Sequence, residues 1–493
     1  MAFMVSPGVN VSEIDLTTTV GKGISTSIGA FAGNFQWGPA NERVLISNEV
    51  ELVTWFGKPS ANTARTTQIQ GWWTAANFLA YGENLSVVRA ADTSTVKNSV
   101  AGNSAIIIKS RDDYEINYMN MQATANAGMF ACKYPGDIAN GLRVAVFAAN
   151  DSTAFANWTY STSFNGYPST SAYANTRGGA NDSMHIVVVD TQSGTFSGTP
   201  NTILERFSYV SKASDAKNDD GSSNYYVNVL NERSEYIYAI HHAQNTSTYA
   251  ADTSTWGNTA NGVAFSQGNV SYLLTFSGGV GGIPSDAAIQ NAYAQFASAE
   301  DTDVSLIMTG AHSNTVCQYV LNNVSEFRKY CLTFVSPAYS DVVNNPGGEV
   351  TAAVARRNYL GSSSFGVMDS SWKYQYDSYN NVYRWVPANG DVAGLCARTD
   401  QTRDPWFSPA GLNRGQIKNV YKLSWSPSKT DRDNLYKNAI NPIVTFKGDG
   451  TVLYGDKTLQ SKPSAFDRIN VRRLFIVLEK TIARASKYSL FEF

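Results

Sequence analysis

The chain has 493 residues, of which 43% are hydrophobic, 12% are aromatic and only 16% are charged, and its formal net charge is −2. This length predicts two or three domains with a sizeable hydrophobic core. This net charge argues against nucleic acid as the main partner, because that role usually needs a basic face to neutralise phosphates, although it leaves room for a local basic patch.

No apolar run reaches the roughly 18 residues of a membrane-spanning helix, and the N-terminus lacks the basic and apolar stretches of a secretory signal. Stable membrane insertion is therefore not expected. The cysteines stand far apart without a CxxC pair, which predicts reduced, buried thiols. The four histidines show no metal-ligand spacing, so no metal site is predicted.

Residues 1–20 are predicted to form an extended arm. Val9, Val11 and Ile14 are spaced among polar residues, and the pair Pro7 and Gly8 disfavours a helix. Such a segment has too little apolar surface to fold alone, but it can add a strand to the sheet of a neighbouring subunit. The alternative is an ordinary disordered N-terminus.

Residues 21–90 have the pattern of compact α/β structure. Asn48 followed by Glu51 predicts the start of a helix, and Gly57 predicts its end. A second amphipathic helix is expected over 68–81, with strands around it. From 91 to 270 the sequence is rich in Ser, Thr, Asn, Tyr and Gly, and short strand-like pieces such as "AIIIKS" and "MHIVVVDT" alternate with polar stretches. This composition predicts an inserted, mainly β domain.

After residue 270 the α/β pattern returns. The segments "SYLLTFSGG", "VSLIMTG" and "CLTFVSP" are predicted strands, and the helices between them predict parallel pairing with right-handed crossovers. The predicted fold class is therefore multidomain α/β or α+β. A discontinuous α/β core domain comprises residues 21–90 and 271–493, with 91–270 inserted as a mainly β domain and 1–20 as the arm.

The segment "FDRINVRRLFIVLEKTIARAS" predicts the best amphipathic helix of the chain, which should bury one apolar side. That side is expected to comprise Ile469, Leu474 or Phe475, Leu478 and Ile482. The predicted core residues are Phe56, Leu79, Val88, Leu306, Val320, Phe334, Leu395 and Leu474.

No motif with catalytic chemistry stands out. The glycine-rich loop at 276–286 lies between a strand and a helix, but Pro284 occupies the third glycine position of a dinucleotide fingerprint. A junction between domains is the better interpretation. Asp377, Asp391, Asp400 and Asp404 lie near arginines, a pattern more typical of ion pairs than of an acid site. No catalytic residue, cofactor or metal is predicted.

The stretch "WKYQYDSYNNVYRW" concentrates aromatic residues that could stack on sugars or bases, or anchor protein contacts. Since no basic groove or array of amides and acids accompanies them, packing and protein interfaces are favoured over a carbohydrate site.

Several segments resemble, in order, the tail sheath proteins of contractile bacteriophages, above all those of T-even-like myophages. They are "SPGVNVSEID", "TSIGAFAGNFQWGPANERVLISNEVELVTWFG", "KYQYDSYNNVYRWVPANGDVAGLCARTDQTRDPWFSPAGLNRGQI", "LYKNAINPI" and "FDRINVRRLF". The segment 91–270 resembles them less and looks shorter than its counterpart in the largest sheath proteins.

The resemblance implies a structural subunit without enzymatic activity or cofactor. Such subunits stack as rings around a tail tube and contract to drive the tube through the host envelope. The implied partners are other copies of the chain, the tail tube protein, the baseplate and the tail terminator. The implied location is the virion tail sheath, assembled in the host cytoplasm. The alternative is a carbohydrate-binding tail or receptor-binding protein, which would use the tyrosine-rich segment 91–270.

The resemblance also assigns expected contact residues. The arm residues Pro7, Gly8, Val9, Val11 and Ile14 are expected to reach a neighbour. Sheath proteins usually continue beyond the counterpart of Phe491, so a missing C-terminal end is also an expectation. Further possible interface residues are Tyr376, Tyr379, Arg384, Trp385, Arg472 and Arg473.

Overall fold

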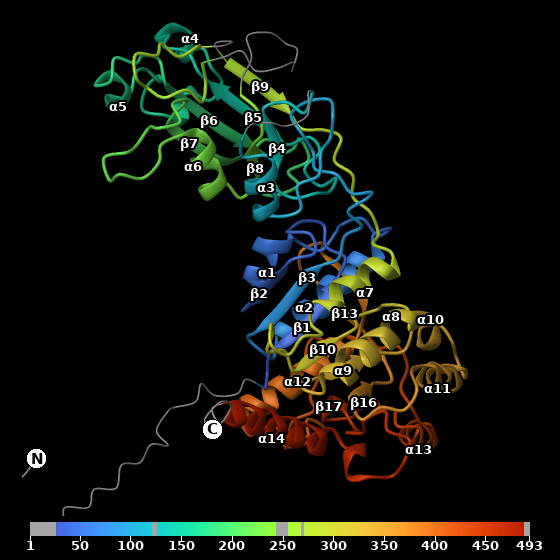
Figure 1. The fold of residues 1–493 in the computed structure, drawn as a ribbon. Coiled ribbons are helices and arrows are strands. Elements are labelled where there is room, and N and C mark those ends of the chain that lie inside the picture. Colours follow the sequence, from blue (N-terminus) through green and yellow to red (C-terminus); the bar gives the residue numbers. More distant parts are fainter. Residues whose placement is uncertain (1–25, 121–125, 243–254, 268–270, 488–493) are drawn as a thin grey trace, which may run out of the picture.

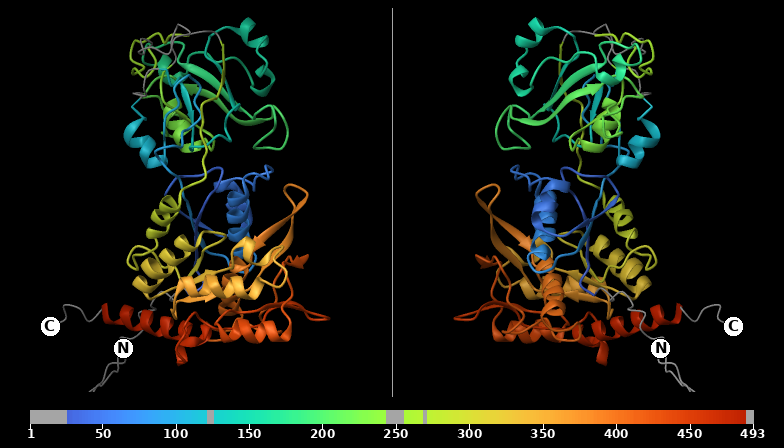
Figure 2. Two further views of the ribbon diagram at one scale, coloured as in Figure 1. Left: turned by 90° about the vertical axis from the view of Figure 1, so that its right-hand side faces the viewer. Right: turned by 90° about the vertical axis from the view of Figure 1, so that its left-hand side faces the viewer.

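The computed structural model describes residues 26–120, 126–242, 255–267 and 271–487. The chain forms two regions stacked end to end (Figure 1, Figure 2). The large region combines residues 26–90 with 284–487. The second region comprises most of 97–280, and we call it the middle region because it lies in the middle of the sequence. The predicted arm, including the residues expected to contact a neighbour, lies outside the described residues.

The large region is built on a six-stranded sheet with the order β12-β11-β10-β1-β3-β2. All neighbouring strands are parallel except β2, which runs antiparallel to β3 at the edge. Because β1 lies between β3 and β10, strands from both ends of the sequence share one sheet. The strands are β1 (Gly29–Gly33), β2 (Arg43–Ile46), β3 (Leu85–Arg89), β10 (Leu306–Met308), β11 (Leu332–Val335) and β12 (Gly366–Met368).

Helices cover both faces of this sheet, which explains why its central strands are buried throughout. Phe31 of β1 points to the face packed by α2 and α12. Ala30 and Ala32 point to the opposite face, packed by α7 and α8. The helices of this region up to α12 are α1 (Glu49–Phe56), α2 (Thr66–Leu79), α7 (Asp286–Ala294), α8 (Asn314–Tyr319), the π-helical turn η2 (Val320–Ser325), α9 (Glu326–Arg328), α10 (Tyr339–Val342), α11 (Glu349–Leu360) and α12 (Asn389–Thr402).

The predicted boundaries of α1 are confirmed. The Asn48 side chain accepts a hydrogen bond from the Glu51 amide at 2.9 Å, and Gly57 follows the helix with a φ of 74°. Such a positive φ suits glycine at a helix end. Local cap chemistry therefore fixes this helix independently of its packing.

One predicted strand belongs elsewhere. The segment "SYLLTFSGG" forms β9 (Ser271–Thr275), which pairs antiparallel with β5 of the middle region and not with β10. The prediction that it opens a parallel β-α-β-α-β unit is wrong, whereas the parallel pairing of the next two strands, β10 and β11, is confirmed. An apolar strand does not reveal its partner, because pairing is decided by distant segments.

The middle region holds a four-stranded antiparallel sheet with the order β7-β6-β5-β9 and a separate pair, β4 with β8. The predicted strand "AIIIKS" makes only an isolated bridge, between Asn98 and Ile106. The elements of this region, apart from β9, are β4 (Phe130–Cys132), β5 (Arg143–Phe147), β6 (Ser183–Val189), β7 (Ile203–Ser211), β8 (Ile237–Ala239), α3 (Arg111–Asn117), α4 (Ser152–Ala156), the 3-10 turn η1 (Ser161–Ser163), α5 (Ala172–Asn175) and α6 (Tyr226–Arg233).

Side chains of the large region anchor the two regions to each other. Trp37, on the loop after β1, is buried among aromatic rings of the middle region. Its ring centroid lies 5.2 Å from that of Tyr134 and 5.3 Å from that of Phe196. Arg89, at the end of β3, donates to the carbonyl oxygens of Gly38 at 2.7 Å and Pro135 at 2.6 Å. The junction is therefore packed and hydrogen-bonded.

The C-terminal part runs from β13 to the long helix α14, and α14 lies below the sheet in Figure 1. Of the predicted buried side of α14, Ile469 is buried as expected, but Phe475, Leu478 and Ile482 are exposed, by 38%, 44% and 64%. The helix instead buries Ile476 and three basic side chains. The elements of this part are β13 (Trp372–Asp377), β14 (Val382–Pro387), β15 (Lys422–Leu423), α13 (Lys429–Lys437), β16 (Ile443–Phe446), β17 (Gly450–Leu453), the 3-10 turn η3 (Ala465–Asp467) and α14 (Ile469–Lys487).

The predicted core is largely correct. Leu79 and Leu474 are only partly buried. The other six are buried, with exposed fractions of 1% or less: Phe56, Val88, Leu306, Val320, Phe334 and Leu395.

Candidate functional site

The carboxyl ends of β10, β11 and β12 form the edge where open α/β sheets commonly bind ligands. Here the edge is filled by the chain itself. Ser336 donates to Asp369 Oδ2 at 2.6 Å, and Asn389, at the start of α12, donates to Ser336 Oγ at 3.0 Å. Asn389 also accepts from the Gly310 amide at 3.0 Å. These buried polar groups bond one another, so the network ties α12 to the sheet.

The network predicts a pH-dependent stability centred on Asp369. Burial raises the pKa of this carboxyl group to about 7, against 3.8 for an ordinary aspartate. The folded chain therefore keeps a proton that the unfolded chain releases, and stability falls as the pH rises from about 4 to about 7. The change can reach about 4 kcal/mol, since one pKa unit corresponds to about 1.4 kcal/mol.

Urea denaturation at pH 4.5 to 8 checks this expectation on the parent chain and the Asp369→Asn variant. The Asn variant should be less sensitive to pH across this window. Equal pH profiles for the two chains would contradict a protonated Asp369 in the fold.

The glycine-rich loop 276–286 connects β9 of the middle region to α7 of the large region, in line with its interpretation as a domain junction. The Gly279 amide donates to Asn140 Oδ1 at 2.9 Å. A Cβ atom at Gly279 would lie 2.1 Å from Ser99 Oγ and 2.3 Å from the Gly136 carbonyl oxygen. Glycine is therefore required there for close backbone approach.

The hairpin β13–β14 reverses the usual polarity of a surface strand. Its inner face buries Lys373, Gln375 and Asp377. Its outer face presents Tyr376 and Tyr383, which are 48% and 43% exposed. Surface strands ordinarily place apolar residues inward and polar residues outward. The hairpin has the opposite arrangement, with aromatic rings outside and polar side chains inside.

The outer rings form one continuous aromatic surface, which we call the hairpin face. The ring centroid of Tyr374 lies 4.8 Å from that of Trp385 and 5.4 Å from that of Tyr383. Tyr421, 68% exposed, extends the surface at 4.8 Å from Tyr383. The ammonium of Lys422 stands over the Tyr374 ring at 5.0 Å. The hairpin face thus comprises Tyr374, Tyr376, Tyr383, Trp385, Tyr421 and Lys422.

The inner face of the hairpin is held by buried charge. Lys373 Nζ donates to Asp391 Oδ1 of α12 at 2.8 Å, and the Tyr81 hydroxyl donates to the same oxygen at 3.0 Å. Burial raises the pKa of Asp391 and lowers that of Lys373, while the ion pair opposes both shifts. This pairing of residues 18 positions apart locks the hairpin onto α12.

The hairpin turn is fastened to the loop after α1 and to α1 itself. The Tyr379 hydroxyl donates to Glu49 Oε1 at 2.8 Å. Arg384 pairs with Asp377 at 3.3 Å and donates to the Ser60 carbonyl oxygen at 3.2 Å. Of the expected contact residues in the hairpin, Tyr376 is thus available on the surface and Trp385 partly so. Arg384 is mostly enclosed within the subunit.

Arg472 and Arg473 differ from the expectation of interface residues, because both are buried within the subunit. Arg472 donates to Ser364 Oγ at 2.8 Å, and its guanidinium lies over the Phe466 ring at 4.0 Å. Arg473 pairs with Asp400 of α12 at 2.5 Å. Their long side chains find acceptors inside the fold, and this is why α14 turns its basic side inward and its apolar side outward.

The acidic residues near arginines form ion pairs in three of four cases, as the charge pattern indicated: Asp377, Asp391 and Asp400.

The prediction missed a basic pocket around Arg398, Arg403 and Arg414. Its signal was the density of arginines at the end of α12 and in the following loop.

The described part of the chain contains no group of three or more His, Cys, Asp or Glu side chains suited to a metal ion. None of its helices is long and apolar enough to cross a membrane.

The comparisons with known proteins agree with this architecture. Residues 287–459 match the central domain of phage tail sheath proteins. The tail sheath protein of Enterobacteria phage T4 is 33% identical over 604 aligned positions, covering 99% of this chain and 87% of that protein. The tail sheath protein of Vibrio phage KVP40 is 30% identical, with 99% and 88% covered. Since the alignments exceed the 493 residues of the chain, these relatives carry segments without a counterpart here.

Two solved structures share the fold at low identity. A sheath tail protein from Listeria innocua superimposes with a TM-score of 0.52 at 10% identity, over 92% of this chain and 74% of that one. One from Desulfitobacterium hafniense gives 0.51 at 9% identity, over 98% and 83%. Both show a mixed α/β fold related to this one. The likeness to the T4 protein, at 33% identity over nearly the whole sequence, shows that this chain belongs to the phage tail sheath protein family.

Proposed function

We propose that this chain is the structural subunit of a contractile phage tail sheath. Copies polymerise as stacked rings around a tail tube, rest on a baseplate and contract to drive the tube through the host envelope. The observation that carries the proposal is the match to sheath proteins along 99% of the chain. The chain would act in the virion tail, after assembly in the host cytoplasm.

The mechanism needs no catalytic step. The energy for contraction is stored in the folded, assembled subunits, and the tail tube and tail terminator are further partners. The large region is held together by buried ion pairs and by the hydrogen-bond network at the carboxyl ends of its strands. These interactions suit a subunit that moves as a rigid body while its contacts with other subunits change. No cofactor has a role in this proposal.

The domain arrangement follows from the same proposal. Residues 21–90 and 271–493 form the core domain, although β9 at 271–275 pairs with the middle region. The segment 91–270 is an inserted domain that projects outward from the tube, and residues 1–20 are the arm that links subunits. Support for the inserted domain comes from its separate antiparallel sheet and from hydrophobic clusters drawn mainly from its own residues.

The hairpin face is the best candidate for a contact between subunits. Replacing Tyr376 and Tyr383 by Ser should impair polymerisation, because large aromatic rings dominate the energetics of interfaces. The monomer should keep its stability within about 1 kcal/mol, since both side chains are only about half buried. Tyr167→Ser, at a ring 40% exposed in the middle region, is the matched control.

Sedimentation of polymer and urea denaturation of monomer measure the two effects separately. Normal polymerisation of the double variant would show that the hairpin face is not part of the interface between subunits.

Negative-stain microscopy of the purified chain tests the function itself. Tubes or stacked rings are expected. Glycan binding without such assemblies would favour the alternative, a carbohydrate-binding tail or receptor-binding protein, which the sheath relatives do not support.

A further inference from the structure

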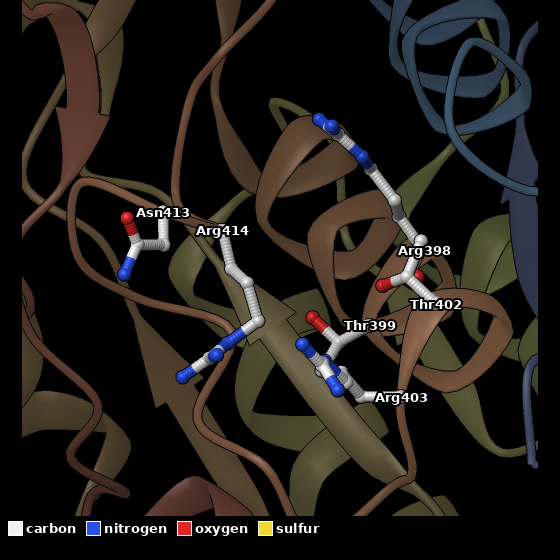
Figure 3. Close-up of a pocket in the computed structure, with 6 residues that line it drawn as sticks. All are labelled: Arg398, Thr399, Thr402, Arg403, Asn413 and Arg414. Carbon is white, nitrogen blue, oxygen red and sulfur yellow. The ribbon is translucent and has the colours of Figure 1, made fainter.

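A basic pocket of about 380 Å³ opens at the end of α12. Figure 3 shows the side chains around it, which come from the helix end and from the facing loop: Arg398, Thr399, Thr402, Arg403, Asn413 and Arg414. In this view the guanidinium groups of Arg403 and Arg414 lie on either side of the opening, while Arg398 extends away from them. Two positively charged groups therefore share one hollow.

Within the part of the chain that the structure describes, no carboxylate pairs with the arginines of this pocket. The ion pairs there engage other basic side chains. Asp400, three positions before Arg403, pairs instead with Arg473 of α14. The side chain of Arg414 is held in place because its Nε donates to the Ser408 carbonyl oxygen at 2.7 Å. The pocket thus carries positive charge that the described ion pairs do not balance.

The threonine hydroxyl groups of the pocket are already engaged as donors. Thr399 donates to the Leu395 carbonyl oxygen at 2.7 Å, and Thr402 donates to the Arg398 carbonyl oxygen at 2.9 Å. The guanidinium groups are therefore the main donors that a ligand would meet in the pocket.

The end of α12 balances only part of the positive charge. Arg403 directly follows the last residue of this helix. The free carbonyl groups of a helix end carry the equivalent of about half a negative charge, which favours a basic side chain there. One arginine would be sufficient for that purpose, and the pocket holds three. Most of its positive charge is therefore left for an anion.

The shape of the guanidinium groups favours a phosphate group as the anion. Each guanidinium presents a planar fork of N–H donors that can bond two oxygen atoms at once. A single carboxylate has two oxygen atoms and one negative charge, so one fork satisfies it. A phosphate ester has three terminal oxygen atoms and carries close to two negative charges at neutral pH. It can therefore accept hydrogen bonds from Arg403 and Arg414 together.

We propose that this pocket binds a phosphate group, either as inorganic phosphate or as the phosphate of a small ester. The phosphate lies between Arg403 and Arg414, where it offsets the repulsion between their charges. It joins the end of α12 to the loop that carries Arg414, and binding therefore stabilises the folded chain. The proposal goes beyond the sheath function, which needs no ligand, and it applies to the single subunit.

Isothermal titration calorimetry on the purified full chain tests the proposal. Inorganic phosphate, glycerol phosphate and the dicarboxylate malonate are titrated at equal ionic strength, with chloride as the balancing anion. Both phosphates should bind at one site per chain. Malonate should bind several-fold more weakly, because it divides its two charges between two groups whereas a phosphate carries them on one.

The two phosphates distinguish the two sources of the group. Equal affinities would identify free phosphate as a sufficient ligand, and tighter binding of glycerol phosphate would identify a phosphate ester. Absence of binding by both phosphates overturns the proposal. Binding of malonate as tight as that of the phosphates also overturns it, since the pocket would then recognise carboxylates equally well.

Arg403→Gln should weaken phosphate binding about tenfold, because it removes hydrogen bonds to a charged group. The described residues show no hydrogen bond or ion pair of the Arg403 side chain, so the ligand-free variant should unfold at the same urea concentration as the parent chain. Arg206→Gln is the matched control, since Arg206 is an exposed arginine of β7 outside the pocket. This control should bind phosphate as the parent chain does.

Urea denaturation in phosphate provides a second measurement. A ligand that binds only the folded chain raises the unfolding midpoint, so phosphate at about ten times its Kd should stabilise the parent chain and Arg206→Gln clearly more than Arg403→Gln. Equal stabilisation of all three would reveal only the general effect of phosphate salts. That result, or unchanged affinity in Arg403→Gln, overturns the proposal, whereas tubes formed by the parent chain would leave the sheath function standing.

Discussion

Replacing Lys373 by Met is expected to destabilise the chain by about 3 to 5 kcal/mol, because it leaves Asp391 as an unpaired carboxylate in the interior. Both side chains are 1% exposed, and their charged atoms lie 2.8 Å apart. Among the described residues, the second carboxylate oxygen, Asp391 Oδ2, has no hydrogen-bond partner. The Tyr81 hydroxyl still donates to Oδ1 at 3.0 Å, but it carries no charge that could replace the lost ammonium group.

The double replacement of Lys373 by Met and Asp391 by Leu should recover a large part of this loss, because an apolar pair leaves no unpaired charge. Arg111→Met is the matched control, since Arg111 pairs with Glu115 at the same 2.8 Å on an exposed helix. It should cost no more than about 0.5 kcal/mol. Urea denaturation near pH 7 compares the variants, and equal effects of Lys373→Met and Arg111→Met would refute a structural role for the buried pair.

Local chemistry explains which parts of the fold were predictable. The capping roles of Asn48 and Gly57 depend only on residues close to them in sequence, so the ends of α1 can be predicted from the sequence. The apolar runs of β10 and β11 likewise predict buried parallel strands. What they do not reveal is the partner of an apolar strand, which is why β9 was assigned to the wrong sheet.

Long-range pairing explains the errors at the candidate site. The apolar pattern of α14 suggested that Phe475 and Leu478 face the core. The structure buries Arg473 instead, because Asp400, 73 positions away in sequence, pairs with it. The hairpin follows the same logic: Lys373 turns inward to Asp391, and its aromatic neighbours are left outside. Prediction from hydrophobic periodicity assumes that charged side chains remain exposed to solvent. Buried ion pairs violate this assumption.

Deleting residues 1–20 is expected to abolish polymerisation while leaving a folded monomer. Hydrophobic clusters of the described chain begin at Ile28 and Phe31, so the large region has a core without the deleted segment. The unfolding midpoint in urea should therefore change little, whereas pelleted polymer should be lost.

A chain with Glu13→Gln and Asp15→Asn separates the main-chain contribution of the arm from the contribution of its two carboxylates in the same assay. If main-chain hydrogen bonds to a neighbouring sheet provide most of the contact, this chain should still polymerise, with a higher critical concentration. If the carboxylates provide it, the chain should behave like the deletion. Tubes of normal length from the chain lacking residues 1–20 would show that the arm is dispensable, and the contacts between subunits would then have to lie on surfaces such as the hairpin face.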